Sequence, residues 1–271
     1  MKKILSLVLA CAMLFAMSVT VFAVEATPDL LSEDVILSLT LQDHEACYDY
    51  LLQYKEDNPA ATSAELDAVA ADFYTELYEA KASSPVPADS WYDDLLHNQF
   101  GMNDDEIELA SQYPSDLAAI YTSSNIAQNE ADDRYWAGAY LGNKDAFRHA
   151  AWNALIICRF YALGKGNFEW CLERTRIWTT AHETGAAKPA GISTAQFNVE
   201  KEMDILNNAA GRAAAEDTYT SEYLALEEVQ YYVDNGFCKR IKTDAQITYE
   251  LPQMALISPW TLRSTNTAGK N

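Results

Sequence analysis

The chain has 271 residues, of which 40 are acidic and 19 are basic, and its net charge at pH 7 is −21. A protein this acidic repels phosphate groups, which excludes nucleic acid and anionic membranes as main partners. The length suits one large domain, or one domain with a smaller appendage.

The first 23 residues have the pattern of a secretory signal peptide. Lys2 and Lys3 precede an apolar stretch, and Val21-Phe22-Ala23 fits the small-x-small rule for cleavage. No second long apolar stretch follows, so we expect no stable membrane span. The sequence therefore predicts a secreted, extracellular protein, cleaved near Ala23, with an unknown extracellular or cell-envelope substrate as its partner.

Hydrophobic spacing indicates helices along the whole chain and an all-α fold, a multi-helix orthogonal bundle with an N-terminal helical hairpin. The hairpin and a linker are expected over 24–90, with one helix at 29–56 and a second from the capping box at 62–65 to about 82. The linker is the stretch SSPVPADS at 83–90.

A helical, motif-bearing domain is expected over 91–245, followed by an irregular C-terminal tail over 246–271. The tail includes a short extended piece at 246–249, and a loop is expected at 129–144 because of its glycines and aromatic residues. The helices of this domain are expected at 91–100, 103–113, 115–129, 145–163, 168–183, 195–216 and 221–235.

A stripe of polar residues marks the helix expected at 145–163. Asp145, His149 and Asn153 are four residues apart, so a helix places all three on one face. Alanine, phenylalanine and tryptophan flank them, which indicates a buried segment. Buried polar groups need partners, so other polar segments of the chain should pack against this stripe.

Two later segments offer such partners. Thr179, His182 and Glu183 share one face at the end of the helix expected at 168–183. The helix expected at 195–216 repeats the four-residue step with Asp204, Asn208 and Arg212. Packing the three faces together would gather two histidines, three carboxylates, two amides and a guanidinium. Such mixed acids and bases are typical of functional sites.

Three interpretations of this cluster remain open. His149, His182 and Asp204, with Glu183 as a further ligand, could bind a divalent metal, which is the one cofactor that the residues suggest. Alternatively, His149 is a general base oriented by Asp145 or Asp204, and Arg212 holds an anionic group. In the third interpretation, the groups only satisfy one another and join the helices.

The candidate residues fall into two groups. The catalytic candidates are the acids and bases: His149, His182, Asp204, Asp145 and Glu183. The substrate-binding candidates are Arg148, Asn153, Asn208, Arg212 and Trp152.

The other two histidines have ordinary structural interpretations. His44 lies beside Asp43 and Glu45, which indicates a solvated helix face, and His97 follows two leucines, which indicates a packing residue. The chain has no GxSxG, HExxH, P-loop or GxGxxG motif, so serine-hydrolase, zincin and nucleotide-binding functions have no motif support.

Four cysteines lie outside the predicted signal peptide, and none belongs to a CxxC pair, which disfavours a zinc–thiolate site. Export permits disulfides. Cys158 and Cys171 flank the Gly-Lys-Gly break at similar distances, so an antiparallel helical hairpin would bring them level. We therefore predict a Cys158–Cys171 bridge, which leaves Cys47 and Cys238 as the other pair.

The three motif segments together resemble an uncharacterised family of bacterial exported or wall-associated domains. Its motifs are DAFRHAxWNA, AHE and MDxxNNxxGR, and the resemblance covers about residues 100–216. A more distant similarity to bacterial phospholipase A2 helices lacks the aspartate after the histidine and the calcium loop. The family resemblance implies no particular activity, but it implies functional roles for Asp145, Arg148, His149, Trp152, Asn153, His182, Glu183, Asp204, Asn207, Asn208 and Arg212.

Two functions follow from these observations. The first is an exported hydrolase that uses the His/Asp/Glu/Asn cluster. The alternative is a non-catalytic structural or interaction domain in which the cluster is a buried polar network.

Overall fold

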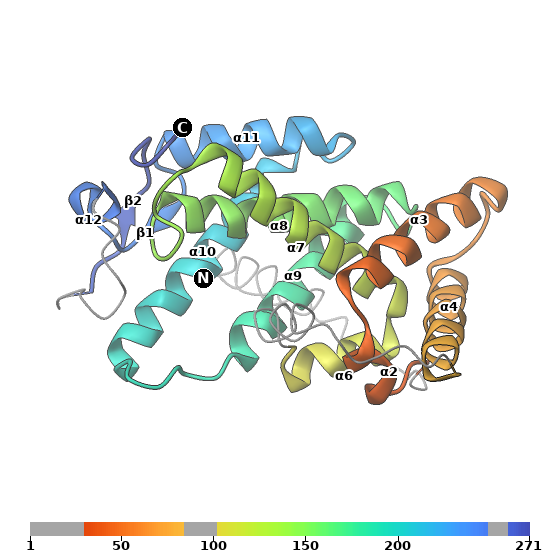
Figure 1. The fold of residues 1–271 in the computed structure, drawn as a ribbon. Coiled ribbons are helices and arrows are strands. Elements are labelled where there is room, and N and C mark those ends of the chain that lie inside the picture. The colour runs from red at the N-terminus through yellow and green to blue at the C-terminus, as the bar shows by residue number, and fades with distance from the viewer. Residues whose placement is uncertain (1–29, 84–101, 249–259) are drawn as a thin grey trace, which may run out of the picture.

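The computed structural model describes residues 30–83, 102–248 and 260–271, and it confirms the all-α, multi-helix fold (Figure 1). A pair of two-residue antiparallel strands, β1 (Lys239–Arg240) and β2 (Arg263–Ser264), accompanies the helices. The helices are α2 (Glu33–Ser38), α3 (Leu41–Asp57), α4 (Ser63–Ser83), α6 (Asp104–Gln112), α7 (Pro114–Arg134), α8 (Asn143–Ala162), α9 (Phe168–Gly185), α10 (Thr194–Ala214), α11 (Glu222–Asp234) and α12 (Asp244–Thr248).

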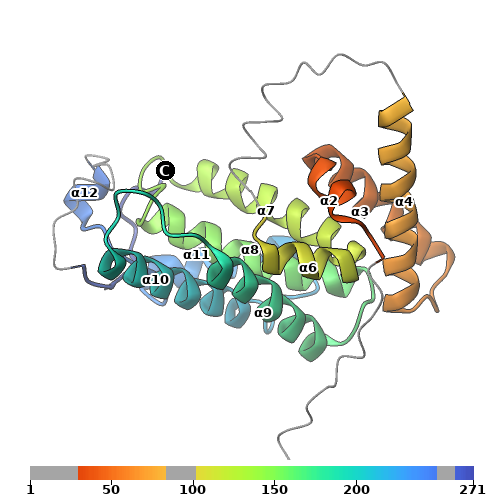
Figure 2. The same ribbon diagram turned by 90° about the horizontal axis from the view of Figure 1, so that it is seen from below.

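Helix α8 forms the centre of the fold and contacts α7, α9, α10 and α11. Figure 2 shows α7 along one side of α8, with α9 and α10 along the other. Nearly every side chain of α8 is buried, because its sequence is rich in alanine and large apolar residues on all faces. The polar residues at its N-terminal half therefore lie in the interior, where each needs a partner.

The N-terminal helices pack on α7 and α6. Helices α3 and α4 contact α7, and α2 contacts α6. The hydrophobic core is continuous across this contact, since Leu51 and Tyr74 belong to the same cluster of buried residues as Phe147 and Leu155. The N-terminal helices therefore contribute to the packing that holds α7 against α8.

The helix expected over 29–56 is interrupted, and that prediction was wrong. Helix α2 ends at Ser38, and Thr40 begins α3 through a reciprocal capping box with Asp43. The hydroxyl of Thr40 accepts from the Asp43 amide, and the Asp43 carboxylate accepts from the Thr40 amide, which stabilises a new helix start. His44 on α3 is buried and bonded to Tyr74, so the predicted solvated face was also wrong.

The C-terminal half differs from the sequence prediction in two places. Helix α7 runs to Arg134, into the region expected as a loop, and α12 includes residues 246–248 of the piece expected to be extended. The end of the chain then packs back on the segment after α7. The Asn271 amide donates to the Arg134 carbonyl at 2.8 Å, and the Trp136 amide donates to Gly269 at 2.9 Å. These bonds fix one end of the segment that leads into α8.

The cysteines are a further correction. Cys47, Cys158, Cys171 and Cys238 are buried and free, so the predicted Cys158–Cys171 bridge is wrong. Both of these thiols pack in the hydrophobic core, and burial raises the pKa of each to about 12. They behave as small apolar side chains.

Several predictions fall outside the described residues: the signal peptide, most of the linker at 83–90, the helix at 91–100 and the interpretation of His97. Among the helices of the described ranges, none is long and apolar enough to cross a membrane.

Candidate functional site

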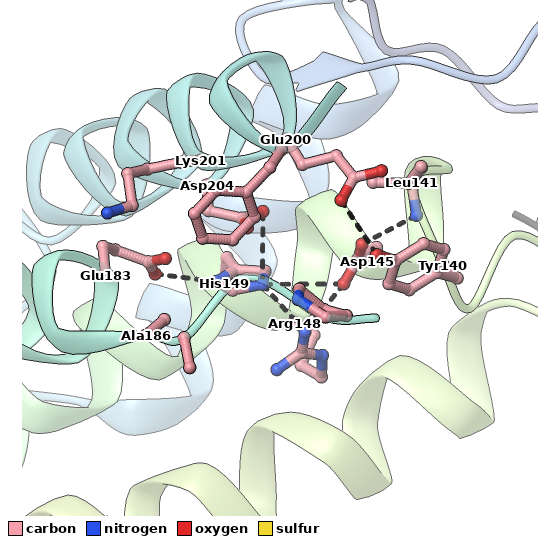
Figure 3. A pocket seen from close by; sticks show the side chains of 13 residues that line it. Tyr140, Leu141, Asp145, Arg148, His149, Glu183, Ala186, Glu200, Lys201 and Asp204 are labelled. Atoms are coloured by element: carbon pink, nitrogen blue, oxygen red, sulfur yellow. Dashed lines mark hydrogen bonds and ion pairs between the residues drawn. The ribbon is translucent and has the colours of Figure 1, made fainter. Parts of the chain in front are cut away.

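The imidazole of His149 lies in the N-terminal half of α8 and faces three carboxylates (Figure 3). Its Nε2 atom is 3.4 Å from Asp204 Oδ1 and 3.6 Å from Asp145 Oδ1, and its Nδ1 atom is 3.7 Å from Glu183 Oε1. The three acids come from α10, α8 and α9. The side chain of His149 is only 6% exposed, so these groups interact with little screening by solvent.

Arg148 links two of these groups. Its Nη2 atom lies 2.7 Å from Asp145 Oδ1 and 2.8 Å from His149 Nε2. Because a guanidinium can only donate, Nε2 is the accepting nitrogen, and the ring proton is on Nδ1. The second Asp145 oxygen accepts from the Leu141 amide at 2.7 Å, and Leu141 has the left-handed φ of 60°. A non-glycine residue in this region is uncommon, and here it aims an amide at the carboxylate.

Burial and charge shift the protonation of the cluster. Burial, followed by the charge of Arg148, holds the pKa of His149 well below its ordinary value, so the imidazole is neutral. Burial and the charges of Asp145 and Glu183 raise the pKa of Asp204 well above its usual range. Burial also raises the pKa of Glu183. A base that resists protonation therefore lies beside acids that retain protons more readily than exposed ones.

Two polar atoms of the cluster have no hydrogen-bond partner among the described residues. His149 Nδ1 and Asp204 Oδ1 are buried and unbonded. Such atoms are costly in a stable core. Glu183, the carboxylate facing Nδ1, is itself held by Asn208, whose Nδ2 donates to Oε1 at 3.0 Å. The surroundings therefore hold the cluster in position but leave two of its polar atoms without hydrogen bonds.

A pocket of about 180 Å³ opens onto the cluster. Asp145, Arg148, His149, Glu183 and Asp204 line it together. The connection between α9 and α10 forms another part of the wall through Ala186, Ala187 and Pro189, and the segment before α8 contributes Tyr140 and Leu141. The volume suits a small molecule or one group of a larger one.

Deeper along the same stripe, the polar residues satisfy one another. Asn153 donates to Asn208 Oδ1 at 2.8 Å and to the His149 carbonyl at 3.0 Å. Its own oxygen accepts from Arg212 at 2.8 Å and from Thr179 at 3.2 Å. We call Asn153, Thr179, Asn208 and Arg212 the amide network. It joins α8, α9 and α10, and within it Asn208 bonds the side chain of a pocket residue, Glu183, while Asn153 bonds the backbone of another, His149.

His182 and Trp152 lie beside the cluster but outside the pocket lining. His182 Nδ1 is 2.9 Å from Glu106 Oε1 on α6, and the indole of Trp152 donates to the Ile120 carbonyl at 3.1 Å. The two rings meet edge to face at 5.2 Å. Within the described residues, the group able to hold a metal ion is Asp145, His149 and Asp204. The structure thus places Asp145, rather than His182, with His149 and Asp204.

Several residues around the site were not predicted from the sequence. Glu200 precedes Asp204 by one turn of α10 and accepts from the Tyr140 hydroxyl at 3.1 Å, so the four-residue spacing could have revealed it. Lys201 also lines the pocket. Glu106 lies in the first turn of the helix expected at 103–113 and belongs to none of the three motifs. Tyr140 and Leu141 lie in a connection without a motif, and no sequence signal indicated them. Asn207, by contrast, bonds the backbone of Lys239 on β1 and is structural.

Comparison with known proteins supports an uncharacterised domain. Residues 107–237 match a family model described as Domain of unknown function (DUF6973). The matched region includes all the residues of the pocket and of the amide network. No curated protein and no solved structure matches the chain.

Proposed function

We propose that the chain is an exported hydrolase whose reaction takes place in the pocket around His149. One observation carries the proposal: a buried, neutral imidazole lies between three carboxylates at 3.4–3.7 Å, at a pocket large enough for a reacting group. A stable core has no need for this arrangement of unsatisfied groups.

The pocket offers the three elements of a hydrolytic reaction. Nε2 of His149 is the candidate acceptor for the proton of an attacking water. Arg148, which lies 2.8 Å from Nε2, has to turn away from it toward the substrate first. Asp204 is the candidate donor for the leaving group, because burial and the neighbouring carboxylates raise its pKa well above its usual range. Arg148 remains cationic and can stabilise negative charge that develops on the substrate.

The amide network favours the second candidate function, a non-catalytic structural or interaction domain. Its side chains bond one another across three helices, as a purely structural network would. In that alternative, His149 and its carboxylates are only the outer part of the same network, and their loss should destabilise the protein as much as the loss of Asn153.

Paired variants separate the two functions. Purified wild-type chain is assayed with chromogenic esters, phosphodiesters, glycosides and peptides, together with His149→Ala and Asp204→Asn. We expect turnover of at least one class by the wild type, and its loss in both variants, which should still fold. Absence of turnover across the panel, or equal turnover in His149→Ala, would overturn the proposal.

Export is the second part of the proposal, and it rests on the N-terminal 23 residues alone. Expression of the full chain in a bacterial host should release a protein that begins near residue 24. Sequencing the N-terminus of the material in the medium measures this. Full-length chain retained in the cytoplasm would contradict it.

A further inference from the structure

The positions of the ligand atoms around His149 suggest a cation site. We propose that the pocket binds one divalent transition-metal ion, zinc or a similar ion, through Asp145, His149 Nε2 and Asp204. We further propose that Arg148 competes with the ion for the same atoms. This inference deepens the proposed function by naming what would activate the water, but its test measures binding and does not need turnover.

Distances between the ligand atoms carry the first step. Ligands about 2.0–2.1 Å from a tetrahedral zinc ion lie roughly 3.3–3.4 Å from one another. Nε2 of His149 is 3.4 Å from Asp204 Oδ1 and 3.6 Å from Asp145 Oδ1. The three residues offer ligand atoms that all lie within 4.8 Å of one another. The two pairs that include His149 are too long for hydrogen bonds and close to the spacing that a shared ion requires.

The surroundings of His149 carry the second step. A metal-binding histidine usually donates its other ring N–H to a carboxylate, which fixes the ring. Here Nδ1 faces Glu183 Oε1 at 3.7 Å, and Asn208 holds that oxygen from the other side at 3.0 Å. The unbonded Asp204 Oδ1 would gain a partner on binding. Mixed nitrogen and carboxylate ligands suit zinc and related ions.

Arg148 carries the third step. Its Nη2 atom lies 2.7 Å from Asp145 Oδ1 and 2.8 Å from His149 Nε2, so a positive charge already contacts two of the three proposed ligands. A metal ion and the Arg148 Nη2 atom compete for Asp145 Oδ1 and His149 Nε2, because the two cannot occupy the space between these atoms together. The Arg148 side chain is 30% exposed, which leaves it room to move out toward the pocket. Three protein ligands would leave a coordination position open for water.

The roles of His149 in the two proposals exclude each other at one atom. Nε2 cannot bind an ion and accept a proton at the same time. With the ion bound, water activation would pass to the ion, and Glu183 beside the site would be the candidate proton acceptor.

Titration calorimetry with zinc sulfate, on chelator-treated full chain, tests the site. We expect one ion per chain, with binding lost in Asp204→Asn and Asp145→Asn. Glu183→Gln should weaken binding by about 10- to 100-fold, because it removes the carboxylate that orients His149. Cobalt(II) absorption of the same samples reports whether the ligand set is tetrahedral. No stoichiometric binding, or binding that Asp204→Asn leaves unchanged, overturns the site.

The competition is tested by a matched pair of variants. Arg148→Gln and Lys201→Gln each remove one positive charge from the pocket lining, but Lys201 contacts the Thr184 carbonyl and the Phe197 ring instead of the ligands. We expect zinc to bind distinctly tighter to Arg148→Gln than to Lys201→Gln. Equal affinities overturn the competition. If Arg148→Gln does not fold, Arg148→Lys serves, since a shorter side chain with a single nitrogen bridges the two atoms poorly.

A chelator assay separates this inference from the proposed function. Hydrolysis that persists in chelator and disappears in His149→Ala would remove the ion and keep the hydrolase. One bound zinc ion per chain without turnover of any substrate would keep the metal site and remove the hydrolase.

Discussion

Asp145, His149 and Asn153 follow one another at four-residue steps on α8, yet their surroundings differ. Asp145 and His149 line a pocket, and His149 Nδ1 has no hydrogen-bond partner among the described residues. Asn153 is fully buried and bonded through both ends of its amide. At the scale of single residues, one helix face thus holds both groups that line a pocket and a structural amide bonded at both ends.

Asn153→Ala should destabilise the protein without changing the pocket lining. The substitution leaves the Asn208 oxygen and an Arg212 donor without their partner in a buried site. Unsatisfied buried groups of this kind cost about 1–3 kcal/mol. Urea unfolding measures the loss, with Asn129→Ala on the exposed face of α7 as a control that should cost little. Equal losses in the two variants would contradict a structural role for the network.

The pair of His182 and Glu106 should make stability depend on pH. Burial alone would lower the pKa of His182, but the hydrogen bond and charge of Glu106 outweigh it, and the pKa is raised. A group with a raised folded-state pKa stabilises fully below its unfolded value of about 6.5 and loses this effect as pH rises through the folded value. The unfolding free energy of the wild type should therefore exceed that of Glu106→Gln by more at about pH 5.5 than at about pH 9.

Glutamine retains an oxygen for the Asn103 amide that Glu106 caps, so the comparison isolates the charge. A difference that stays constant with pH would show that His182 and Glu106 are not an ion pair.

The sequence predicted which residues share a face but not which of them reach solvent. The helical period fixes the positions of Asp145, His149 and Asn153, and four-residue steps fix those of Asp204 and Asn208. Whether a stripe opens onto a pocket depends on connecting segments such as 186–193, whose path carries no periodic signal. His182 was grouped with His149 because both lie in the motifs. Its position in the motif could not show that its side chain bonds Glu106 on α6 instead.

At the scale of helices, Gly211 determines how closely α10 approaches α8. A Cβ atom built on Gly211 would lie 2.0 Å from the Ala150 carbonyl oxygen, and this backbone cannot move aside as a side chain can. The close crossing places Asp204 and Asn208 near His149 and Asn153. The glycine of the MDxxNNxxGR motif is therefore explained by packing.

Gly211→Ala tests this contact against helix propensity. Alanine in a helix interior is favoured over glycine by about 1 kcal/mol, so propensity alone predicts stabilisation. Overpacking typically costs about 1–3 kcal/mol, and a backbone clash belongs at the upper end, so we expect net destabilisation. Ala209→Gly, on the exposed face of α10, is the control and should cost about 1 kcal/mol. Thermal unfolding measures both, and a stabilised Gly211→Ala would refute the close contact.

Helices were predictable from the sequence wherever a long apolar period occurs, as in α8, α9 and α10. The interruption between α2 and α3 was missed because Thr40 and Asp43 form a capping box of the Thr-x-x-Asp type inside an apolar period. Only the hydrogen bonds of the structure show that this capping box starts a new helix although the apolar period continues through it. The short α12 was missed because five residues carry too little periodicity to separate helix from strand.

At the scale of the whole molecule, one buried lysine joins the N-terminal helices to the rest. Lys165 follows α8, its side chain is fully buried, and its Nζ atom donates to Ser115 Oγ at 2.6 Å, to Asp67 at 3.2 Å and to Asp116. Asp67 lies on α4, and Asp116 on α7 also forms an ion pair with Arg174 on α9. No sequence pattern indicated this role, because a lysine between two glycines has the pattern of an exposed turn.

Lys165→Met should therefore weaken the whole fold. Methionine matches the length of the side chain but leaves Asp67 without a cation and Asp116 with Arg174 alone. Breaking a buried ion pair from one side costs about 3–5 kcal/mol, because a charge stays buried and unpaired. Lys144→Met provides the control: its partner Asp132 is half exposed, and such surface pairs contribute about 0–1 kcal/mol.

Adding Asp67→Asn to Lys165→Met should recover part of the loss, since it removes one unpaired charge. Urea unfolding of the four variants, including Asp67→Asn alone, gives the coupling energy. A loss in Lys165→Met no larger than in Lys144→Met would show that this cluster does not hold α4 against α7.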